Sequence, residues 1–395
     1  MSTALQRCVS VDADTFAREH WSRTPLLSRA KELPGDVTDL LTDDAVDELL
    51  MARGLRTPFF RTVSQGAGLP SPVRSAVAGN RTIADLVDPD ALRAQHQDGA
   101  TLVLQSLHRV HPPVGRLCRQ LAEELGHPTQ CNAYVTPGGD AQGFDFHHDT
   151  HDVFVLQVSG RKRWIIHQPV THLPLSSQAA AGEHLVAKGA EPLLDVELEA
   201  GDALYLPRGF VHCALTTDAH SVHLTIGVLS TTWYDVLTDT VTLAAQDPQF
   251  RDALPIQPAA GLDDLPDFLQ RAAAWLAALP PEQVRDLVAK RLDQALPPEP
   301  VGLLATAAAV RDLTATTALR PRRGLRTSLT GGGHATLSAP GKVLTLPAST
   351  YDALGRALAG PAVVADLATG GLDEGDALVL ARRLLREGIV VADRA

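Results

Sequence analysis

The middle of the chain, from about residue 101 to residue 230, is a series of short runs rich in β-branched and aromatic residues. These runs are TLVLQSL, NAYVT, VFVLQV, KRWIIH, ALYLP and SVHLTIGVL, and turns rich in Gly, Pro and Asp separate them. Runs of this length and composition are typical of β-strands. Many short strands without intervening helices predict a sandwich or a barrel.

The hydrophobic pattern changes on both sides of this region. Residues 1–100 mix helical and loop signals around Trp21. After about residue 233 apolar residues recur with the helical period, which predicts helices at about 263–279 and 282–296. A proline-rich segment, PPEP, then reads as a linker that ends this helical region at residue 300.

The last residues form a third pattern. A strand-like run, KVLTLP, precedes helical segments at about 348–359, 361–368 and 373–387, and the strand-like run IVV follows them. This order resembles a winged helix. The pattern therefore predicts an α+β chain of three domains. They are a barrel domain with an N-terminal helical elaboration (1–232), a helical domain (233–300) and a winged-helix-like domain (301–395).

Composition narrows the class of protein. A chain of 395 residues suggests two or three domains. Its net charge of −11 argues against a general electrostatic grip on nucleic acid or on an anionic membrane. The four cysteines are widely spaced, and the N-terminal residues do not resemble a signal peptide. With no long apolar run, these features predict a soluble, cytoplasmic protein without a membrane partner.

The segment GFDFHHDTHDVFVLQV contains the first candidate metal ligands, His147 and Asp149. In an extended backbone, residues i and i+2 point to the same side, so both side chains can reach one ion. A third candidate, His212, lies in GDALYLPRGFVHCA. The spacing of Gly201, Pro207 and Gly209 before it resembles the second motif of the cupin superfamily, where a tight turn places one histidine inside a barrel.

Two histidines and one carboxylate on one face of an octahedron form the facial triad of non-haem iron(II) oxygenases. Four-ligand cupins carry a glutamate a few residues after the first pair, and none is present here. The sequence therefore predicts iron held by His147, Asp149 and His212. By strand parity His148 faces away from the ion, and His151, His220 and His223 are more consistent with supporting polar roles than with ligation.

The run NAYVTPGGDAQGFDFHHD, followed by VFVLQVSGRKRW, LYLPRGFVH and HSVHLTIG, resembles the JmjC-type ribosomal oxygenases. The resemblance is dense over about 100–230 and looser over the rest of the chain. It implies a double-stranded β-helix (cupin, or jelly-roll) core, with Fe(II) as metal and 2-oxoglutarate and O2 as cosubstrates. It also implies that a ribosomal protein is hydroxylated on a histidine or an arginine.

The same resemblance assigns residues to the cosubstrate. A basic residue 15 positions after the first ligand histidine binds the distal carboxylate of 2-oxoglutarate in that family, and Lys162 occupies this position here. Strand parity places Lys162 on the same face as Trp164, whereas Arg161 and Arg163 point outward. Asn132 and Ser221 match polar residues that line the family's pocket. Tyr134 and Thr136 share the alternating face of Asn132 and complete the predicted cofactor-binding set.

Two other functions stay open at this stage. One is a tailoring hydroxylase that acts on a natural-product peptide or small molecule. The other is a non-catalytic cupin sensor or transcriptional regulator. The candidate recognition helix of the tail begins LDEGD, an acidic start that is unsuited to reading DNA, so we expect the tail to bind protein.

Two expectations concern partners other than the substrate. The two amphipathic helices of the middle region carry more apolar surface than a linker needs. Together with the family resemblance they predict a homodimer. Arg320, Arg322, Arg323 and Arg326 are a candidate patch for proximity to the ribosome or RNA.

Overall fold

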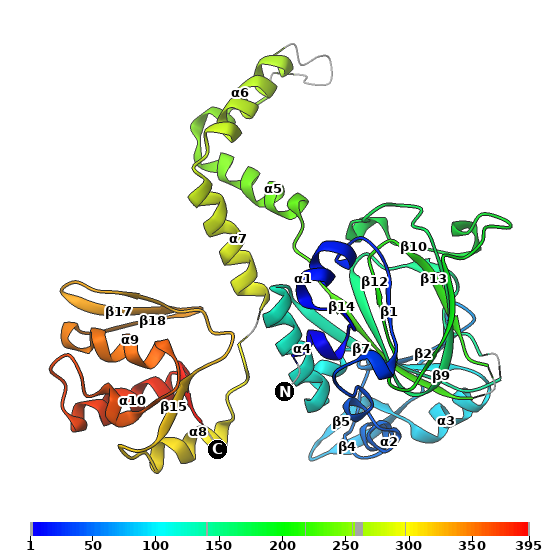
Figure 1. Cartoon of the computed structure of the whole chain (residues 1–395), viewed down its shortest axis with the longest axis horizontal. Helices are drawn as coiled ribbons and strands as arrows, with labels where there is room; N and C mark the ends of the chain where they lie inside the picture. Colours follow the sequence, from blue (N-terminus) through cyan, green and yellow to red (C-terminus); the bar gives the residue numbers. More distant parts are fainter. Residues whose placement is uncertain are drawn as a thin grey trace. The chain divides into compact units, whose positions relative to one another are not determined.

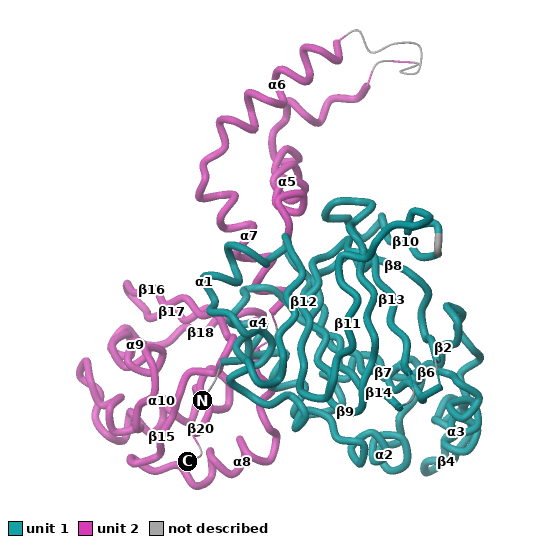
Figure 2. Tube along the Cα trace, turned by 45° about the vertical axis from the view of Figure 1, so that its right-hand side comes forward, with its two compact units in different colours: residues 1–230 teal, residues 231–395 magenta. Residues whose placement is uncertain are grey.

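The computed structural model describes residues 3–139, 141–217, 219–254, 256, 264–296 and 298–393. Contacts divide the chain into two compact units, Met1–Ser230 and Thr231–Ala395 (Figure 2). The first boundary lies close to the predicted one at residue 232. The predicted boundary at residue 300 does not separate compact units, because the helices before it and the C-terminal elements belong to one unit. Every helix among the described residues is too short or too polar to span a bilayer.

The first unit is built on a curled antiparallel sheet (Figure 1). In the part of the chain that the structure describes, twelve strands are connected in it. They are β1 (Leu26–Ser28), β2 (Phe60–Ser64), β3 (Ala67–Gly68), β6 (Thr101–Leu104), β7 (Thr129–Thr136), β8 (His147–His148), β9 (Asp152–His167), β10 (Ala180–Ala181), β11 (Leu194–Glu199), β12 (Ala203–Leu206), β13 (Val211–Leu215) and β14 (Ser221–Val228).

Strand β9 joins the two halves of this sheet. Its first half pairs with β12 and β14, and its second half pairs with β11 and β13. The sequence of the first half, DVFVLQV, is buried at every position, because each of its faces is covered. One long strand shared by two sets of neighbours makes the sheet curl. This arrangement is consistent with the predicted cupin core.

The hydrophobic core lies at two places in this unit. The larger cluster joins the barrel to the helix α4 (Pro112–Leu125), whose buried residues Val114, Leu117, Cys118 and Leu121 follow one helical face. The smaller cluster, which includes Trp164 and Leu204, lies between β9, β11, β12 and β13. The N-terminal segment also belongs to the core, because the ring of Phe16 packs 4.8 Å from that of Tyr205.

The first hundred residues contain more strand than their sequence pattern indicated. They include β1, β2 and β3 of the main sheet and a hairpin of β4 (Val73–Ala78) and β5 (Arg81–Val87), with helices α1 (Ala13–Thr15), α2 (Asp43–Met51) and α3 (Pro89–Gln97). Strand β2 pairs with β6, so residue 61 lies opposite residue 103. The description of this region as a helical elaboration was therefore incomplete.

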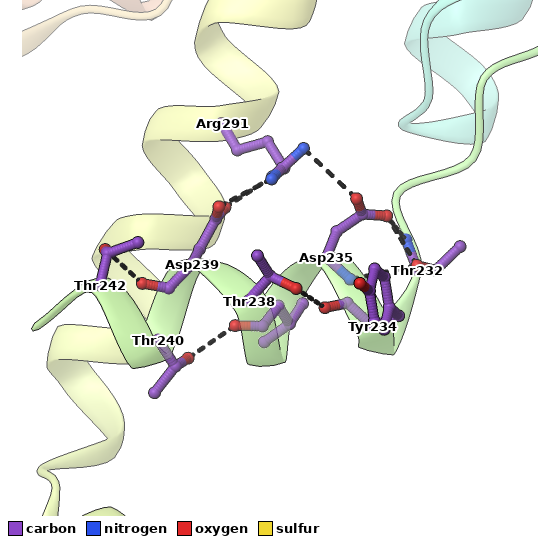
Figure 3. A network of polar contacts seen from close by, with 9 residues as sticks. Thr232, Tyr234, Asp235, Thr238, Asp239, Thr240, Thr242 and Arg291 are labelled. Carbon is purple, nitrogen blue, oxygen red and sulfur yellow. Dashed lines mark hydrogen bonds and ion pairs between the residues drawn. The ribbon is translucent and has the colours of Figure 1, made fainter. Parts of the chain in front are cut away.

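The second unit begins with helices α5 (Trp233–Thr242), α6 (Leu265–Ala278) and α7 (Pro281–Ala295). Arg291 of α7 joins α7 to α5, because its guanidinium lies 2.6 Å from Asp239 and 3.6 Å from Asp235 (Figure 3). Thr232 caps α5 and also donates to Asp235. The polar face of α5 is therefore held against α7, which leaves the apolar side chains of α5 exposed.

The C-terminal elements combine two small sheets with three helices. The sheet of β15 (Ala318–Pro321), β19 (Ala362–Val363) and β20 (Val390–Ala392) and the sheet of β16 (Ser328–Thr330), β17 (His334–Ala339) and β18 (Lys342–Pro347) are both antiparallel. The helices are α8 (Leu303–Arg311), α9 (Tyr351–Ala359) and α10 (Glu374–Arg386). The predicted helix at 361–368 is a short strand followed by a 3₁₀ turn, Val364–Leu367.

Three of the four arginines of the candidate nucleic-acid patch have partners within the chain. Arg320 lies 2.7 Å from Glu299, and Arg326 lies 2.7 Å from Asp293. Arg322 donates to the backbone carbonyl of Glu299. These three arginines therefore bind groups inside the second unit, which weakens the prediction that they face RNA.

Candidate metal centre and cosubstrate pocket

The three predicted metal ligands come together at the edge where β8 and β13 pair. His212 of β13 lies directly opposite His147 of β8, and Asp149 is the first residue after β8. One ligand atom from each of the three side chains can be chosen such that all lie within 4.8 Å of one another. Within the described residues this is the one group of three or more histidine, cysteine or acidic side chains so arranged.

Both histidines have the tautomer that a metal needs. The Nδ1 atom of His147 lies 2.8 Å from the carbonyl oxygen of Asp145, and the Nδ1 atom of His212 lies 3.0 Å from that of Phe210. A carbonyl oxygen can only accept a hydrogen bond, so each Nδ1 must carry the proton. Each Nε2 therefore keeps its lone pair. The Nε2 atom of His212 points toward Asp149, 3.8 Å from its Oδ2.

The electrostatic setting agrees with this assignment. Burial, and after it the neighbouring His147, lower the pKa of His212 to about 4, so its imidazole is neutral at physiological pH. Only neutral imidazole binds a metal. Two imidazoles and one carboxylate are the donor set of the iron facial triad. The residues present therefore fit a divalent iron with open positions for other ligands.

The turn before His212 connects it to Asp149. The backbone N–H of Gly209 donates to the carbonyl of Asp149 at 2.9 Å. The buried carboxylate of Asp152 accepts from the backbone N–H of Arg208 at 3.2 Å and from the Tyr205 hydroxyl at 3.1 Å. The glycine–proline turn that the sequence indicated therefore holds Asp149 and His212 in fixed positions relative to each other.

We expect Gly209→Ala to destabilise this turn. Gly209 has φ +93°, and a Cβ there would lie 2.7 Å from the carbonyl oxygen of Thr171 and 2.8 Å from Pro174. Backbone strain of this kind costs on the order of 1–3 kcal/mol, and the close contacts add to it. The control is Gly126→Ala, which has φ +70° but open space around the added methyl group. Chemical denaturation should show a larger loss for Gly209→Ala, and an equal loss would contradict the role of close packing.

Lys162 is a buried ammonium with no acidic partner among the described residues. Only 3% of it is exposed, and its Nζ donates to the Thr136 hydroxyl at 2.8 Å. Burial lowers the pKa of Lys162 to about 7. The neighbouring arginines point outward and lie near acidic residues of β11, with Arg163 2.6 Å from Asp195 and Arg161 4.0 Å from Glu197. A buried cation of this kind requires an anionic ligand to be stable in its charged form.

The metal centre and Lys162 line one cavity of about 170 Å³. Its wall consists of Arg61, Thr101, Tyr134, Gly143, Phe144, His147, Asp149, Val153, Val155, Lys162, Trp164, His212, Ala214, His223 and Thr225. Asp149 is the only acidic side chain in this lining. A ligand with two anionic ends can therefore meet the metal at one end and Lys162 at the other.

The other predicted cosubstrate residues occupy different places. Tyr134 lines the cavity, and the Thr136 hydroxyl accepts a hydrogen bond from Lys162 Nζ. Asn132 and Ser221 are absent from the lining. The Asn132 side chain accepts from the backbone of Ser106, and the Ser221 hydroxyl accepts from Gln157. Asn132 and Ser221 thus contact neighbouring protein groups outside this lining, and their direct contact with the cosubstrate stays a prediction.

The other histidines that the sequence offered as metal ligands lie in different places in the structure. The Nε2 atom of His148 lies 2.9 Å from the Gln178 carbonyl, away from the metal centre. His151 lies beside Gln130, and His220 lies near Asp43 on the surface. His223 differs, because it lines the cavity. The sequence predicts supporting polar roles for His220 and His223 without deciding which of them faces the site, and the structure has a β-bulge between residues 222 and 223.

Several wall residues were not identified from the sequence. Arg61 of β2 stacks over the ring of Phe144 at 5.1 Å. Phe144 contacts the rings of both Tyr134 and His147. Arg61 comes from a region without a strand signal, and it reaches the cavity only because β2 pairs with β6. Phe144 has no local pattern that distinguishes it from other loop aromatics.

The fold and the site together define a class of protein. A curled antiparallel barrel with a His-Asp-His cluster inside is a cupin-fold protein with a facial-triad metal centre. Comparison with known proteins is more specific. Residues 104–236 match the JmjC domain family. Over these residues the chain is similar to JmjC domains, and its sequence is similar to those of curated ribosomal oxygenases.

Two curated relatives show this relationship. Ribosomal oxygenase 1 of Gallus gallus is 34% identical over 253 residues, which are 62% of this chain and 40% of the relative. The bifunctional lysine-specific demethylase and histidyl-hydroxylase NO66 of Drosophila mojavensis is 30% identical over 219 residues, 55% of this chain and 24% of the relative. The chain thus spans less than half of the length of either protein.

Solved structures extend the likeness of fold to nearly the whole chain. The ribosomal oxygenase YcfD of Escherichia coli has a TM-score of 0.56 at 19% identity, with 98% of this chain and 99% of that chain covered. A structure of YcfD in complex with cobalt and 2-oxoglutarate has a TM-score of 0.57 at 19% identity, with the same coverage. This likeness includes the second unit and not only the barrel.

Proposed function

We propose that this protein is an Fe(II)- and 2-oxoglutarate-dependent oxygenase that hydroxylates a side chain of a ribosomal protein. The observation that carries the proposal is the pairing of two sites in one cavity. One is a His-Asp-His cluster with both Nε2 lone pairs free for a metal. The other is Lys162, a buried cation without an acidic partner among the described residues. Together they match a cosubstrate that chelates a metal and carries a distant carboxylate.

Each group of the chain has a defined task in this reaction. His147, Asp149 and His212 would hold the iron from one side and leave its other positions free. The bound iron, with 2-oxoglutarate and O2, supplies the oxidation of an unactivated C–H bond. Lys162 would bind the distal carboxylate and fix the direction of the cosubstrate. The apolar residues Val153 and Val155 exclude water from the cavity, which strengthens this charge pair.

The substrate assignment follows from the relatives. Ribosomal oxygenases and a histidyl-hydroxylase are among the curated proteins that match, which supports a histidine or arginine of a ribosomal protein as the target. We place the activity in the cytoplasm, where ribosomal proteins are synthesised. The tailoring-hydroxylase and sensor alternatives have no comparable support. A complete set of metal ligands beside a buried lysine that has no acidic partner among the described residues is also more than a non-catalytic barrel requires.

Mass spectrometry tests this function. Ribosomal proteins from a strain that lacks the gene should be modified by the purified protein, iron and 2-oxoglutarate, with a gain of one oxygen atom on one residue. The same treatment without 2-oxoglutarate is the control. If 2-oxoglutarate is turned over to succinate but every ribosomal protein keeps its mass, the oxygenase chemistry stands and the ribosomal substrate is wrong.

We also propose that the helical part of the second unit forms a homodimer. The exposed face of α5 includes Trp233, which is 87% exposed, and Leu237, which is 49% exposed. The opposite face of α5 is held by Arg291, as shown in Figure 3. An apolar face of this size is typical of an interface between subunits. The ring of Trp275 on α6 packs 5.2 Å from that of Phe250 within the chain.

Light scattering at micromolar concentration should give a mass near twice the 42.0 kDa of one chain. The double substitution Trp233→Glu and Leu237→Glu should reduce it to one chain, because two charges would be buried in the interface. Leu303→Glu on α8, which alters a residue that is 84% exposed outside this face, is the control. A mass near 42.0 kDa for the unmodified protein would refute the dimer.

The C-terminal elements are proposed to form a winged-helix-like domain that binds protein. The support is the order of helices and strands from α8 to β20, with the hairpin of β17 and β18 as the wing. Helix α10 begins with a capping box of Asp373 and Asp376, so its N-terminal turn is acidic. An acidic turn repels phosphate, which argues against DNA as the partner.

A further inference from the structure

Two residues that line the cavity each contain a buried nitrogen atom without a hydrogen-bond partner among the described residues. These atoms are Nε1 of Trp164 and Nδ1 of His223. Both side chains are almost fully buried, with 4% of Trp164 and 3% of His223 exposed. Buried polar atoms are nearly always paired in proteins, so two unpaired nitrogen atoms beside the same cavity indicate a ligand that pairs with them.

Both residues line the cavity that the metal centre shares with Lys162. The indole of Trp164 is stacked 5.8 Å from the ring of His212, and its other neighbour is the ring of His223 at 5.4 Å. His223 in turn stacks on Tyr134 at 4.8 Å with nearly parallel planes. Trp164 and Lys162 are two residues apart on β9, so they face the same side of the strand.

The two nitrogen atoms require a hydrogen-bond acceptor as their partner. The indole N–H of Trp164 only donates. Burial, and after it the charge of Lys162, lower the pKa of His223, so the ring is neutral and donates from one nitrogen. Among the described residues of the cavity lining, the side-chain oxygen acceptors are the carboxylate of the metal ligand Asp149 and the hydroxyls of Thr101, Tyr134 and Thr225. Donors beside a buried ammonium are the surroundings that a carboxylate requires.

We propose that Trp164 and His223 donate hydrogen bonds to the dicarboxylate cosubstrate that Lys162 anchors, and that these two positioning residues help to select it. This inference rests on the proposed function, because it assumes that the cavity holds 2-oxoglutarate. In this arrangement Trp164 and His223 lie along the path of the cosubstrate from the metal to Lys162. The stacking of His223 on Tyr134 holds the plane of the imidazole ring.

The test uses the metal-free full-length protein and glutarate, a five-carbon dicarboxylate without the keto group that chelates a metal. Calorimetry in the presence of EDTA should show binding to the unmodified protein. Trp164→Phe and His223→Phe keep an aromatic ring but remove the N–H groups, and each should weaken glutarate binding about tenfold or more. Trp275→Phe and His334→Phe, both in the second unit, are the matched controls and should bind normally.

A second measurement separates direct contact from a structural role. The indole N–H resonance that disappears in Trp164→Phe belongs to Trp164, and glutarate should shift it in the unmodified protein. An unshifted resonance at saturating glutarate, or unchanged affinity in both variants, would overturn the inference. If those results occur while 2-oxoglutarate is still turned over, the proposed function survives. If neither glutarate nor 2-oxoglutarate binds, even with iron present, the proposed function itself fails.

Discussion

Replacing His147 or His212 by alanine is expected to abolish stoichiometric iron binding and the turnover of 2-oxoglutarate. Each histidine offers one Nε2 lone pair to the ion, and two ligands cannot hold iron in a site designed for three. The removal of one ligand costs several orders of magnitude in affinity, more than the roughly 10–100-fold loss that follows the removal of an outer-shell partner. Metal analysis of the purified protein after anaerobic loading measures this directly.

The control for this experiment is His148→Gln. His148 lies between the two ligands in sequence, but its Nε2 atom faces the carbonyl of Gln178. A glutamine amide can donate to the same carbonyl, so this variant should keep its iron and its activity. Circular dichroism should show that all three variants are folded. Full iron content in His147→Ala or His212→Ala would remove that residue from the metal centre.

The metal centre could be predicted from the sequence because its determinants are local. Alternation along an extended strand places His147 and Asp149 on one side, and this rule needs no knowledge of the rest of the fold. The turn that carries His212 is also local, since its glycines and proline fix the backbone. The same alternation predicts that Lys162 and Trp164 share one side of the strand. It also predicts that Arg163 points outward, and in the structure Arg163 pairs with Asp195.

The rest of the cavity wall could not be predicted, because it depends on which strands pair and in which register. Arg61 reaches the site through the pairing of β2 with β6. Asn132 has the same parity as Tyr134, yet its side chain accepts from the backbone of Ser106. Whether a residue lines the cavity or supports it is decided by such long-range contacts, which leave no periodic signal in the sequence.

Long-range contacts also limited the prediction of domain boundaries in the second unit. Its helices were predicted from their period, and α6 and α7 lie close to the expected positions. The salt bridge between Arg291 and Asp239 joins helices that are fifty residues apart in the chain. The ion pair of Arg320 with Glu299 likewise crosses the predicted linker. Contacts of this kind merge two expected domains into one compact unit.

Replacing Lys162 by methionine is expected to weaken 2-oxoglutarate binding far more than iron binding. Methionine keeps the apolar stem but removes the charge that the distal carboxylate requires. The loss of one partner of a buried charge pair costs about 2–5 kcal/mol, or roughly a thirtyfold to several-thousandfold increase in Kd. Calorimetry with the manganese-loaded protein in the absence of oxygen measures both affinities. Unchanged affinity for 2-oxoglutarate would show that Lys162 is not the anchor.

The pH dependence of binding gives an independent test of the same pair. Burial lowers the pKa of Lys162 to about 7 in the unliganded protein. A carboxylate binds the ammonium form, so the bound carboxylate must raise this pKa again. Below pH 7 the lysine is charged before binding, and the affinity should not change as Lys162 is titrated. Above pH 7 binding must take up a proton, so the Kd should increase by up to about tenfold per pH unit.

The Lys162→Met variant should not show this increase between pH 7 and 9, because it has no group to protonate at that position. Lys162→Arg is the complementary control. Its guanidinium stays charged at every pH in this range, so it should also remove the pH dependence while retaining part of the affinity. Proton uptake, measured by calorimetry in buffers of different ionisation enthalpy, should accompany binding to the unmodified protein alone. A Kd that is constant from pH 7 to 9 in the unmodified protein would mean that Lys162 is already charged in the free cavity, paired with a group other than the cosubstrate.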